Sequence, residues 1–582
     1  MFLPINKSDM QARGWAEYDF LLITGDAYVD HPSFGAAIIS RVLENAGYRV
    51  CILAQPTSRQ DYTRFGKPKI GVMITAGNID SMVANYTVAK KRRNEDSYSP
   101  GGKNNFRPDR ACIVYTRQIK ELFPDCPVVL GGLEASLRRF RHYDYWSDSV
   151  RDSVLVESGA DVILYGMADN SVIQAAKTLQ NNGSFANIPG VCYMSGHKPK
   201  NCITLSGRTD KVNYAKDAKA IFKEQDPVTG KTIAEPYGAQ FLIQTKPPMP
   251  LTQQEFDRVY ALPYQRDYHP VYKDLGGVDA ILEVAFSIIH NRGCFGSCNF
   301  CSLAYHQGRI VTCRSHDSVM EEAKKITQMP DFKGYIHDVG GPTANFRGPA
   351  CKKQLTSGLC KDKQCLTPRP CKNMVIDHRD YSSLLKKIAG LPKVKKVFVR
   401  SGIRFDYLIN DKNTAFLKQL VQDHISGQLK VAPEHCSDRV LFHMGKPNFE
   451  VYKKFANTYN QLNKQMGKKQ FLVPYFISSH PGCTLNDAIT LTQYLNSIGY
   501  MPLQVQDFYP TPGTLSTTMY YTGIDPRTMA NVYVPKTKEE KAMQRALLQW
   551  RKPQNHALVR KALIECNRQD LIGMAKKCLI RR

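Results

Sequence analysis

Long apolar runs are absent from this 582-residue sequence. A membrane-spanning helix needs about 20 consecutive apolar residues, and no stretch of the chain approaches that length. Residues 1–15 also lack the apolar core and the small-residue cleavage site of a secretory signal. We therefore expect a cytoplasmic protein with no membrane partner.

Acidic residues are scarce as well. The sequence has 52 Asp and Glu against 79 Lys and Arg, which leaves a formal net charge of +27. A surplus of this size favours an anionic partner, of which RNA is the obvious candidate. Net charge alone leaves open the alternative of a basic surface with no such partner. The surplus is heavy near the end of the chain, where residues 526–582 are predicted to form a basic helical tail.

The length exceeds what one hydrophobic core usually organises, so we expect two or three domains. Apolar runs alternate with helical patterns through residues 1–195, which is typical of an open α/β domain with a parallel sheet. The predicted buried strands of this domain are residues 18–25, 48–53, 70–75, 128–130 and 162–165. A connector is predicted at 196–275, and a second series of strands and helices at 276–525.

Seventeen cysteines without a secretory signal indicate a reducing compartment, where thiolates bind metal or pack. Cys294, Cys298 and Cys301 form a C-x3-C-x2-C triad just after a predicted strand at 281–289. Zinc sites usually use four ligands in C-x2-C pairs, and electron-transfer clusters usually take four cysteines. Three thiolates on a four-iron four-sulfur (4Fe-4S) cluster leave one iron open, which can bind the amino and carboxylate groups of S-adenosylmethionine (SAM).

The segment from Arg292 to Cys301, followed by His306-Gln307-Gly308-Arg309, resembles the YgiQ-type family of uncharacterised radical SAM proteins. The resemblance covers nearly the whole chain. It implies a partial (β/α)6 barrel behind a cobalamin-binding-like domain, with a 4Fe-4S cluster on the triad. It also implies reductive cleavage of SAM to a 5'-deoxyadenosyl radical, with electrons from a donor such as flavodoxin or ferredoxin. The substrate is left open.

The resemblance also assigns SAM-binding residues along the barrel. Gly340, Gly341 and Pro342 resemble the glycine motif that holds the SAM amino group through backbone carbonyls, although Pro342 replaces the usual acidic residue. Phe300 is expected to shield the cluster or to pack on adenine, and an ordinary core aromatic is the alternative.

Two further predicted contacts follow later strands. Ser401 and Arg404 lie in the expected third active-site loop, and Glu434 follows the fourth strand. The resemblance implies that Glu434 accepts hydrogen bonds from the SAM ribose.

A second group of cysteines lies in an insertion at residues 345–375, which is rich in Lys and Pro and poor in apolar residues. Its members are Cys351, Cys360, Cys365 and Cys371. A segment of this composition buries too little apolar surface to fold alone, so a bound metal would explain its order. The spacing leaves zinc, a second iron-sulfur cluster and four reduced surface thiols open.

The N-terminal domain raises a separate question. The fuller cobalamin-binding motif is Asp-x-His-x-x-Gly, whereas here Asp30 and His31 are adjacent. Cobalamin held without a protein histidine, and so a cobalamin-dependent radical methylase, stays an alternative to a structural or gating domain. An RNA-binding protein with structural metal clusters is the alternative from another class. A ligand of this domain is expected at the carboxyl ends of its strands, near Gly25-Asp26 and Gly131-Gly132.

Overall fold

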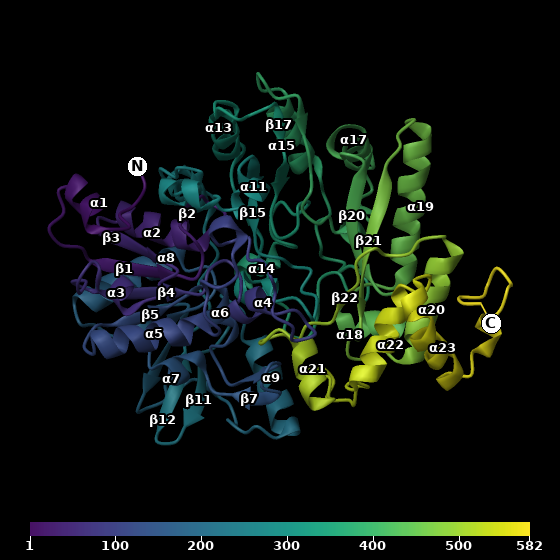
Figure 1. Ribbon diagram of the computed structural model, residues 1–582, viewed down its shortest axis with the longest axis horizontal. Coiled ribbons are helices and arrows are strands. Elements are labelled where there is room, and N and C mark those ends of the chain that lie inside the picture. The colour runs from purple at the N-terminus through teal and green to yellow at the C-terminus, as the bar shows by residue number, and fades with distance from the viewer. Residues whose placement is uncertain (582) are drawn as a thin grey trace.

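The computed structural model describes residues 1–581, which form two lobes that lie side by side (Figure 1). The N-terminal lobe is built on a nine-stranded sheet of order β10-β11-β12-β9-β8-β5-β4-β1-β3. Its strands are β1 (Phe20–Thr24), β3 (Val50–Ala54), β4 (Gly71–Thr75), β5 (Val128–Leu130), β8 (Val162–Leu164), β9 (Val191–Ser195), β10 (Ile203–Thr204), β11 (Ile233–Tyr237) and β12 (Gln240–Gln244). The parallel half, β3-β1-β4-β5-β8, comes from the runs that predicted it.

Alternation along the strands explains how helices cover both faces of this sheet. On one face, Phe20 and Leu22 of β1 pack with helix α2 (Gly35–Asn45) and helix α8 (Asp169–Gln180). On the other face, Leu21 and Ile23 pack with helix α5 (Ala111–Leu122). Both faces are therefore apolar, and β1 is buried at every position, as expected for a central parallel strand.

The sheet does not end at residue 195, where the sequence predicted a domain boundary. Strand β12 pairs antiparallel with β9, and β11 pairs antiparallel with β12. These strands fall in the predicted connector at 196–275. Leu242 and Ile243 are fully buried, so the segment completes the N-terminal core.

The C-terminal lobe contains short parallel strands in the predicted chain order. They are β14 (Ser287–Ile289), β17 (Tyr335–Ile336), β18 (Asp338–Gly340), β19 (Lys396–Val397), β20 (Gln428–Glu434), β21 (Phe471–Ser478) and β22 (Gln506–Asp507). Parallel ladders join β14 to β18, β17 to β19, β20 to β21 and β21 to β22. In the described residues no ladder joins β19 to β20, so the strands form an interrupted series and not one continuous sheet.

The predicted strand at 281–289 is wrong in its first half. Residues Ala280–Val284 form helix α11, and only Ser287–Ile289 are extended. Ile281 packs with Val278 against the N-terminal lobe, while Leu282 is 68% exposed. An apolar run with one buried side at helical spacing thus looked like a buried strand.

The predicted basic tail is a packed part of the C-terminal lobe. Helices α22 (Lys538–Leu548) and α23 (His556–Glu565) bury Leu547 and Leu563 in the main core, and Trp550, in the segment between them, is buried there as well. Two of its cations are held in ion pairs, Arg545 with Asp507 and Lys561 with Glu539. RNA binding by this tail stays a prediction. No helix of the described chain has the length and apolar character to cross a bilayer.

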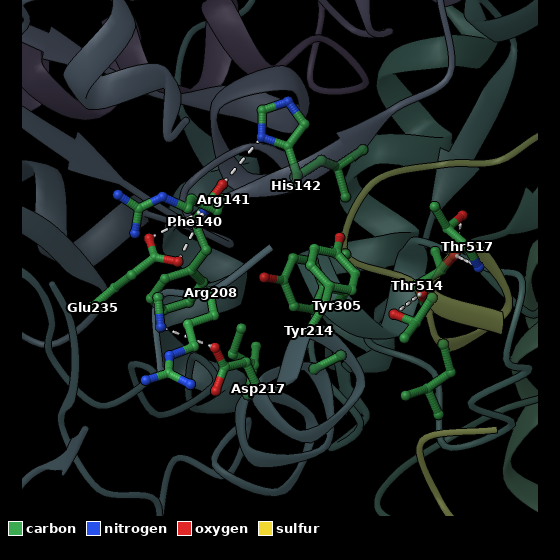
Figure 2. Close-up of a pocket in the computed structure, with 17 residues that line it drawn as sticks. Phe140, Arg141, His142, Arg208, Tyr214, Asp217, Glu235, Tyr305, Thr514 and Thr517 are labelled. Atoms are coloured by element: carbon green, nitrogen blue, oxygen red, sulfur yellow. Dashed lines mark hydrogen bonds between the residues drawn. The ribbon is translucent and has the colours of Figure 1, made fainter. Parts of the chain in front are cut away.

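Aromatic side chains join the two lobes. The rings of Tyr143 and Tyr521 stack with centroids 5.0 Å apart, and the guanidinium of Arg139 lies 3.8 Å from the Tyr305 ring centroid. Figure 2 shows a small cavity of about 40 Å³ at this junction, with Tyr305 near its centre. Glu235 lines the cavity from the N-terminal lobe, and Thr514 lines it from the C-terminal lobe.

Glu235 gives a testable pH dependence. Burial raises the pKa of its carboxyl from 4.5 to about 7, although the nearby charge and backbone N–H of Arg141 oppose the shift. The folded protein therefore binds a proton that the unfolded chain has lost, and this stabilisation disappears as the pH rises from about 4.5 to about 7. The loss should be on the order of 3 kcal/mol.

Glu235→Gln should abolish that loss, because an amide does not titrate. The measurement is the thermal unfolding midpoint at pH 5 and at pH 7. The wild type should lose more stability than the variant, whereas Glu283→Gln, at an exposed position, should behave like the wild type. Equal pH dependence in wild type and Glu235→Gln would contradict the assignment.

Candidate functional site

The cysteine triad lies on a tightly folded loop between strand β15 (Asn291–Arg292) and helix α12 (Leu303–His306). The backbone N–H of Cys294 donates to the carbonyl of Gly308 at 3.1 Å, and that of Cys301 donates to Cys298 at 3.1 Å. Burial, together with the neighbouring thiols of Cys298 and Cys294, raises the pKa of the Cys301 thiol to about 12. The loop therefore gathers three thiols in one largely buried place.

Two glycines allow this loop to close. Gly293 has φ +84°, and a Cβ there would overlap the carbonyl oxygen of Ile310. A Cβ on Gly296 would lie 2.5 Å from the Arg404 guanidinium and 3.4 Å from the Cys294 sulfur. Only glycine fits either position without moving its neighbours.

The glycine motif lies directly against the triad. The hydroxyl of Thr343, which follows Pro342, is 3.5 Å from the Cys294 sulfur. A Cβ on Gly341 would overlap the side chain of Asn291, so motif and triad loop are in close contact. The carbonyl of Gly340 accepts a hydrogen bond from the backbone N–H of His290 at 2.9 Å. One of the predicted SAM acceptors is therefore already used in a backbone hydrogen bond of the protein.

The sequence prediction missed an acidic residue of this motif. Asp338, two positions before Gly340, accepts from the backbone N–H groups of Arg400 at 2.8 Å and Ser401 at 3.1 Å. The Ser401 hydroxyl also donates to it, and burial raises the pKa of its carboxyl. The acidic residue thus precedes the two glycines. Alternate residues of a strand lie on the same face, so the spacing of Asp338 from Gly340 could have suggested that it belongs to the motif.

Arg404 contacts the triad itself. Its Nη1 donates to the Cys298 sulfur at 3.1 Å, while its Nε donates to Asp406 at 2.8 Å. Asp406 is nearly fully buried and fixes the guanidinium in place. The guanidinium is therefore held in contact with the Cys298 sulfur.

Glu434 lies on the triad side of the second lobe. It is 7% exposed, has φ +68°, and follows a register shift between β20 and β21. Burial raises the pKa of its carboxyl, while Lys446, at 3.8 Å, and Arg404 lower it. Its charge also raises the pKa of the Cys301 thiol, which places the carboxylate near the triad.

The other predicted residues lie around this centre. Phe300 is half-buried at the edge of the main core, with its ring centroid 6.1 Å from that of His480. Cys351, Cys365 and Cys371 are partly buried and Cys360 is exposed. Within residues 1–581, no three His, Cys, Asp or Glu side chains converge on the position of a single metal ion.

A cavity of about 440 Å³ lies between the triad region and the carboxyl ends of the N-terminal strands. Thr75, Gly131 and Gly132 line it from the N-terminal lobe, and Gly341 and Pro342 line it from the other side. Gly131-Gly132 was predicted to border a ligand.

At the other predicted turn, Gly25-Asp26, the charged side chain is already paired with a residue of the protein. Asp26 forms an ion pair with the buried Arg107 at 2.8 Å. Asp30 pairs with Arg41, and His31 lies behind Pro32 and Ser33, which do line the cavity. The buried Nε2 of His31 has no hydrogen-bond partner in the described chain.

Buried charges hold the two lobes together at this cavity. The guanidinium of Arg292, next to the triad, pairs with both carboxylate oxygens of Asp169 at 3.0 and 2.8 Å. Asp169 is the first residue of α8 in the N-terminal lobe. Removing either partner would leave a buried charge uncompensated, so this pair fixes the triad loop against the N-terminal sheet.

Two family profiles match parts of this chain. A family profile described as Radical SAM N-terminal matches residues 2–287, and one described as a domain of unknown function (DUF3362) matches residues 503–582. Among solved structures, a radical S-adenosylmethionine methyltransferase, TsrM, from Kitasatospora setae shares 14% identity with a TM-score of 0.48, over 85% of this chain and 75% of that chain. The cobalamin-dependent S-adenosylmethionine radical enzyme OxsB shares 9% identity with a TM-score of 0.49, over 95% and 72%.

Curated relatives are far more similar. A UPF0313 protein of Clostridium perfringens (strain ATCC 13124) is 55% identical over 592 residues, covering 100% of this chain and 89% of the relative. A UPF0313 protein of Clostridium botulinum (strain 657) is 55% identical over 590 residues, covering 100% and 92%. The chain belongs to the UPF0313 family, a radical SAM family of the YgiQ type.

Proposed function

We propose that this protein cleaves SAM reductively at a 4Fe-4S cluster held by Cys294, Cys298 and Cys301. The observation that carries the proposal is the placement of the glycine motif against a three-thiol loop, with Thr343 3.5 Å from the Cys294 sulfur. When bound, such a cluster supplies one electron to the sulfonium of SAM, which releases methionine and a 5'-deoxyadenosyl radical.

The residues around the triad fit this role. The glycines at 293 and 296 let the loop pack closely against Ile310 and Arg404, which holds the three cysteines in one place. Arg404 holds a positive charge against Cys298. Glu434 offers a buried carboxylate for ribose hydroxyls, and Gly341 and Pro342 border the cavity where the methionine end of SAM would lie.

The direct test is SAM cleavage under anaerobic conditions. The protein would be reconstituted with iron and sulfide, reduced with dithionite, and assayed for 5'-deoxyadenosine and methionine. Both products should form in equal amounts. A chain that carries a full cluster and gives neither product would refute the proposal.

Glu434→Gln tests the predicted ribose contact. Loss of a charged hydrogen-bond acceptor should raise the KM for SAM about tenfold, because such a bond is worth roughly 1.5 to 3 kcal/mol. The cluster absorbance should stay unchanged. An unchanged KM would place Glu434 outside the SAM site, and Glu283→Gln is the exposed control.

The cavity between the lobes supports a second candidate, a cobalamin-dependent radical methylase. It lies at the carboxyl ends of a parallel sheet, where α/β domains bind cofactors, and it opens to the glycine motif. The adjacent pair Asp30-His31 supplies no ligand there, so cobalamin would be held without a protein histidine. Incubation with hydroxocobalamin and gel filtration tests this candidate, and a chain that retains no corrinoid would exclude it.

A further inference from the structure

The cysteine-rich insertion is docked on the triad loop. The side-chain amide of Gln364 donates to the carbonyl of Ser297 at 2.6 Å and to the side chain of Asn299 at 2.9 Å. Leu366 is fully buried in a small core that includes Cys294, and Cys365 packs against the same core. The insertion therefore forms one wall of the triad site.

The four thiols of the insertion lie near one another although they are spread over 21 residues of sequence. The side-chain amide of Gln354 donates to the sulfur of Cys365 at 3.8 Å, and its backbone N–H donates to the carbonyl of Cys351 at 3.2 Å, so these two cysteines lie against the same residue. The backbone N–H of Cys371 donates to the carbonyl of Cys365 at 2.8 Å, which ties the ends of the segment together. All four are free thiols.

A buried cation faces this group. Arg309 is 4% exposed and donates to the carbonyls of Cys360 at 3.4 Å and Lys363 at 3.1 Å. Its buried Nε has no hydrogen-bond partner in the described chain. These two bonds hold the guanidinium against the segment of the insertion that carries Cys360. A buried cation that forms no ion pair in the described chain, next to a cysteine-bearing segment, fits an anionic group at this place.

The chemistry of four thiolates distinguishes one metal ion from a cluster. Ligands of a single zinc ion all lie about 2.3 Å from it and so crowd together. No such convergence occurs among residues 1–581, either in the insertion or in the triad. Thiolates of a 4Fe-4S cluster bind different iron atoms and stand farther apart. The insertion also lacks the C-x2-C pairs that zinc sites usually use, because eight, four and five residues separate its successive cysteines, and so iron and sulfide suit it better than one zinc ion.

We propose that Cys351, Cys360, Cys365 and Cys371 hold a second 4Fe-4S cluster, which passes electrons to the triad. Four protein ligands leave no open iron, so this cluster cannot bind SAM, and electron transfer is the chemistry left to it. The segment His306-Gln307-Gly308-Arg309 links the two groups, because the carbonyl of Gly308 accepts from Cys294 while Arg309 donates to the carbonyl of Cys360.

The surface around Cys360 suits an acidic donor protein. Cys360 itself is exposed, and the insertion carries five exposed cations, Lys352, Lys353, Lys363, Arg369 and Lys372, against the single exposed carboxylate Asp362. Flavodoxin-type donors would be steered to such a surface by charge. One electron would leave the reduced flavin, pass through the second cluster to the triad cluster, and reach the sulfonium of SAM, which loses methionine.

Iron analysis of three full-length proteins tests the site. These are the wild type, a triad variant (Cys294→Ala, Cys298→Ala and Cys301→Ala) and an insertion variant with alanine at all four cysteines. After anaerobic reconstitution, the wild type should hold about eight iron and eight sulfide ions per chain, and each variant about four. A triad variant without iron, or with one zinc ion, would overturn the proposal. This readout does not depend on SAM cleavage, so it can fail or succeed separately from the proposed function.

Cys360→Ser tests the relay while keeping the other three ligands. Formation of 5'-deoxyadenosine driven by reduced flavodoxin should fall at least about tenfold, whereas formation driven by dithionite, a small reductant that reaches the triad directly, should change by less than about twofold. Cys202→Ser, a partly exposed cysteine of the N-terminal lobe, should leave both rates unchanged. Equal rates with flavodoxin in wild type and Cys360→Ser would refute the relay.

Discussion

Cys298→Ala should reduce 5'-deoxyadenosine formation to the background measured without protein. Cys298 is the triad member whose sulfur receives the Arg404 guanidinium at 3.1 Å. Its loss removes one of the three proposed iron ligands and the sulfur that the Arg404 guanidinium contacts, while Arg404 keeps its ion pair with Asp406. Two thiolates cannot hold the cluster that the proposed reaction needs, so the effect should be a loss of reaction and not a change in KM.

Cys313→Ala is the matched control for this variant. Cys313 is buried in the same small core as Cys294, yet it lies outside the triad. Its replacement should cost some packing but leave the reduced-cluster signal in electron paramagnetic resonance intact. If Cys298→Ala kept both that signal and SAM cleavage, the triad would not be the cluster site.

The parallel half of the N-terminal sheet could be predicted from the sequence because its strands are short and apolar on both faces. Val128–Leu130, for example, is a run of three fully buried residues that forms β5. The triad could also be predicted, since its spacing and its place after a strand are local features. Residues that are close in the sequence stay close in the folded protein, so local patterns of this kind can be recognised from the sequence alone.

The rest of the site depends on contacts between distant segments. Asp338 reaches Ser401 across 63 positions, and Gln364 reaches Ser297 across 67. No periodicity in either segment records such a pairing. The antiparallel strand β12 was missed for the same reason, because its burial comes from pairing with β9 and not from a distinctive run of its own.

Arg404 lies in the loop that the sequence predicted, but the group that its side chain contacts could not be predicted. The sequence placed it in an active-site loop with Ser401. The structure brings its guanidinium to the triad because Asp406, two residues on, accepts from its Nε and Nη2 and fixes its direction. A side chain's direction depends on such a partner, which the loop sequence alone does not identify.

Gly293→Ala should destroy the triad site although it removes no ligand. At φ +84° an alanine costs roughly 1 to 2 kcal/mol of backbone strain. The added Cβ would also overlap the carbonyl oxygen of Ile310, which is backbone and cannot rotate away. The loop must then shift and carry Cys294 with it, so iron binding at the triad and SAM cleavage should fall at least about tenfold.

Gly308→Ala separates strain from collision. Gly308 has nearly the same φ, +85°, but nothing lies within 4 Å of a Cβ built there. This variant should lose roughly 1 to 2 kcal/mol of stability and keep its triad cluster, since its carbonyl can still accept from Cys294. Thermal unfolding and SAM cleavage of both variants measure the difference. If both lost the cluster to the same degree, backbone strain alone would govern the loop, and the close packing of Gly293 against Ile310 would not be what holds Cys294 in place.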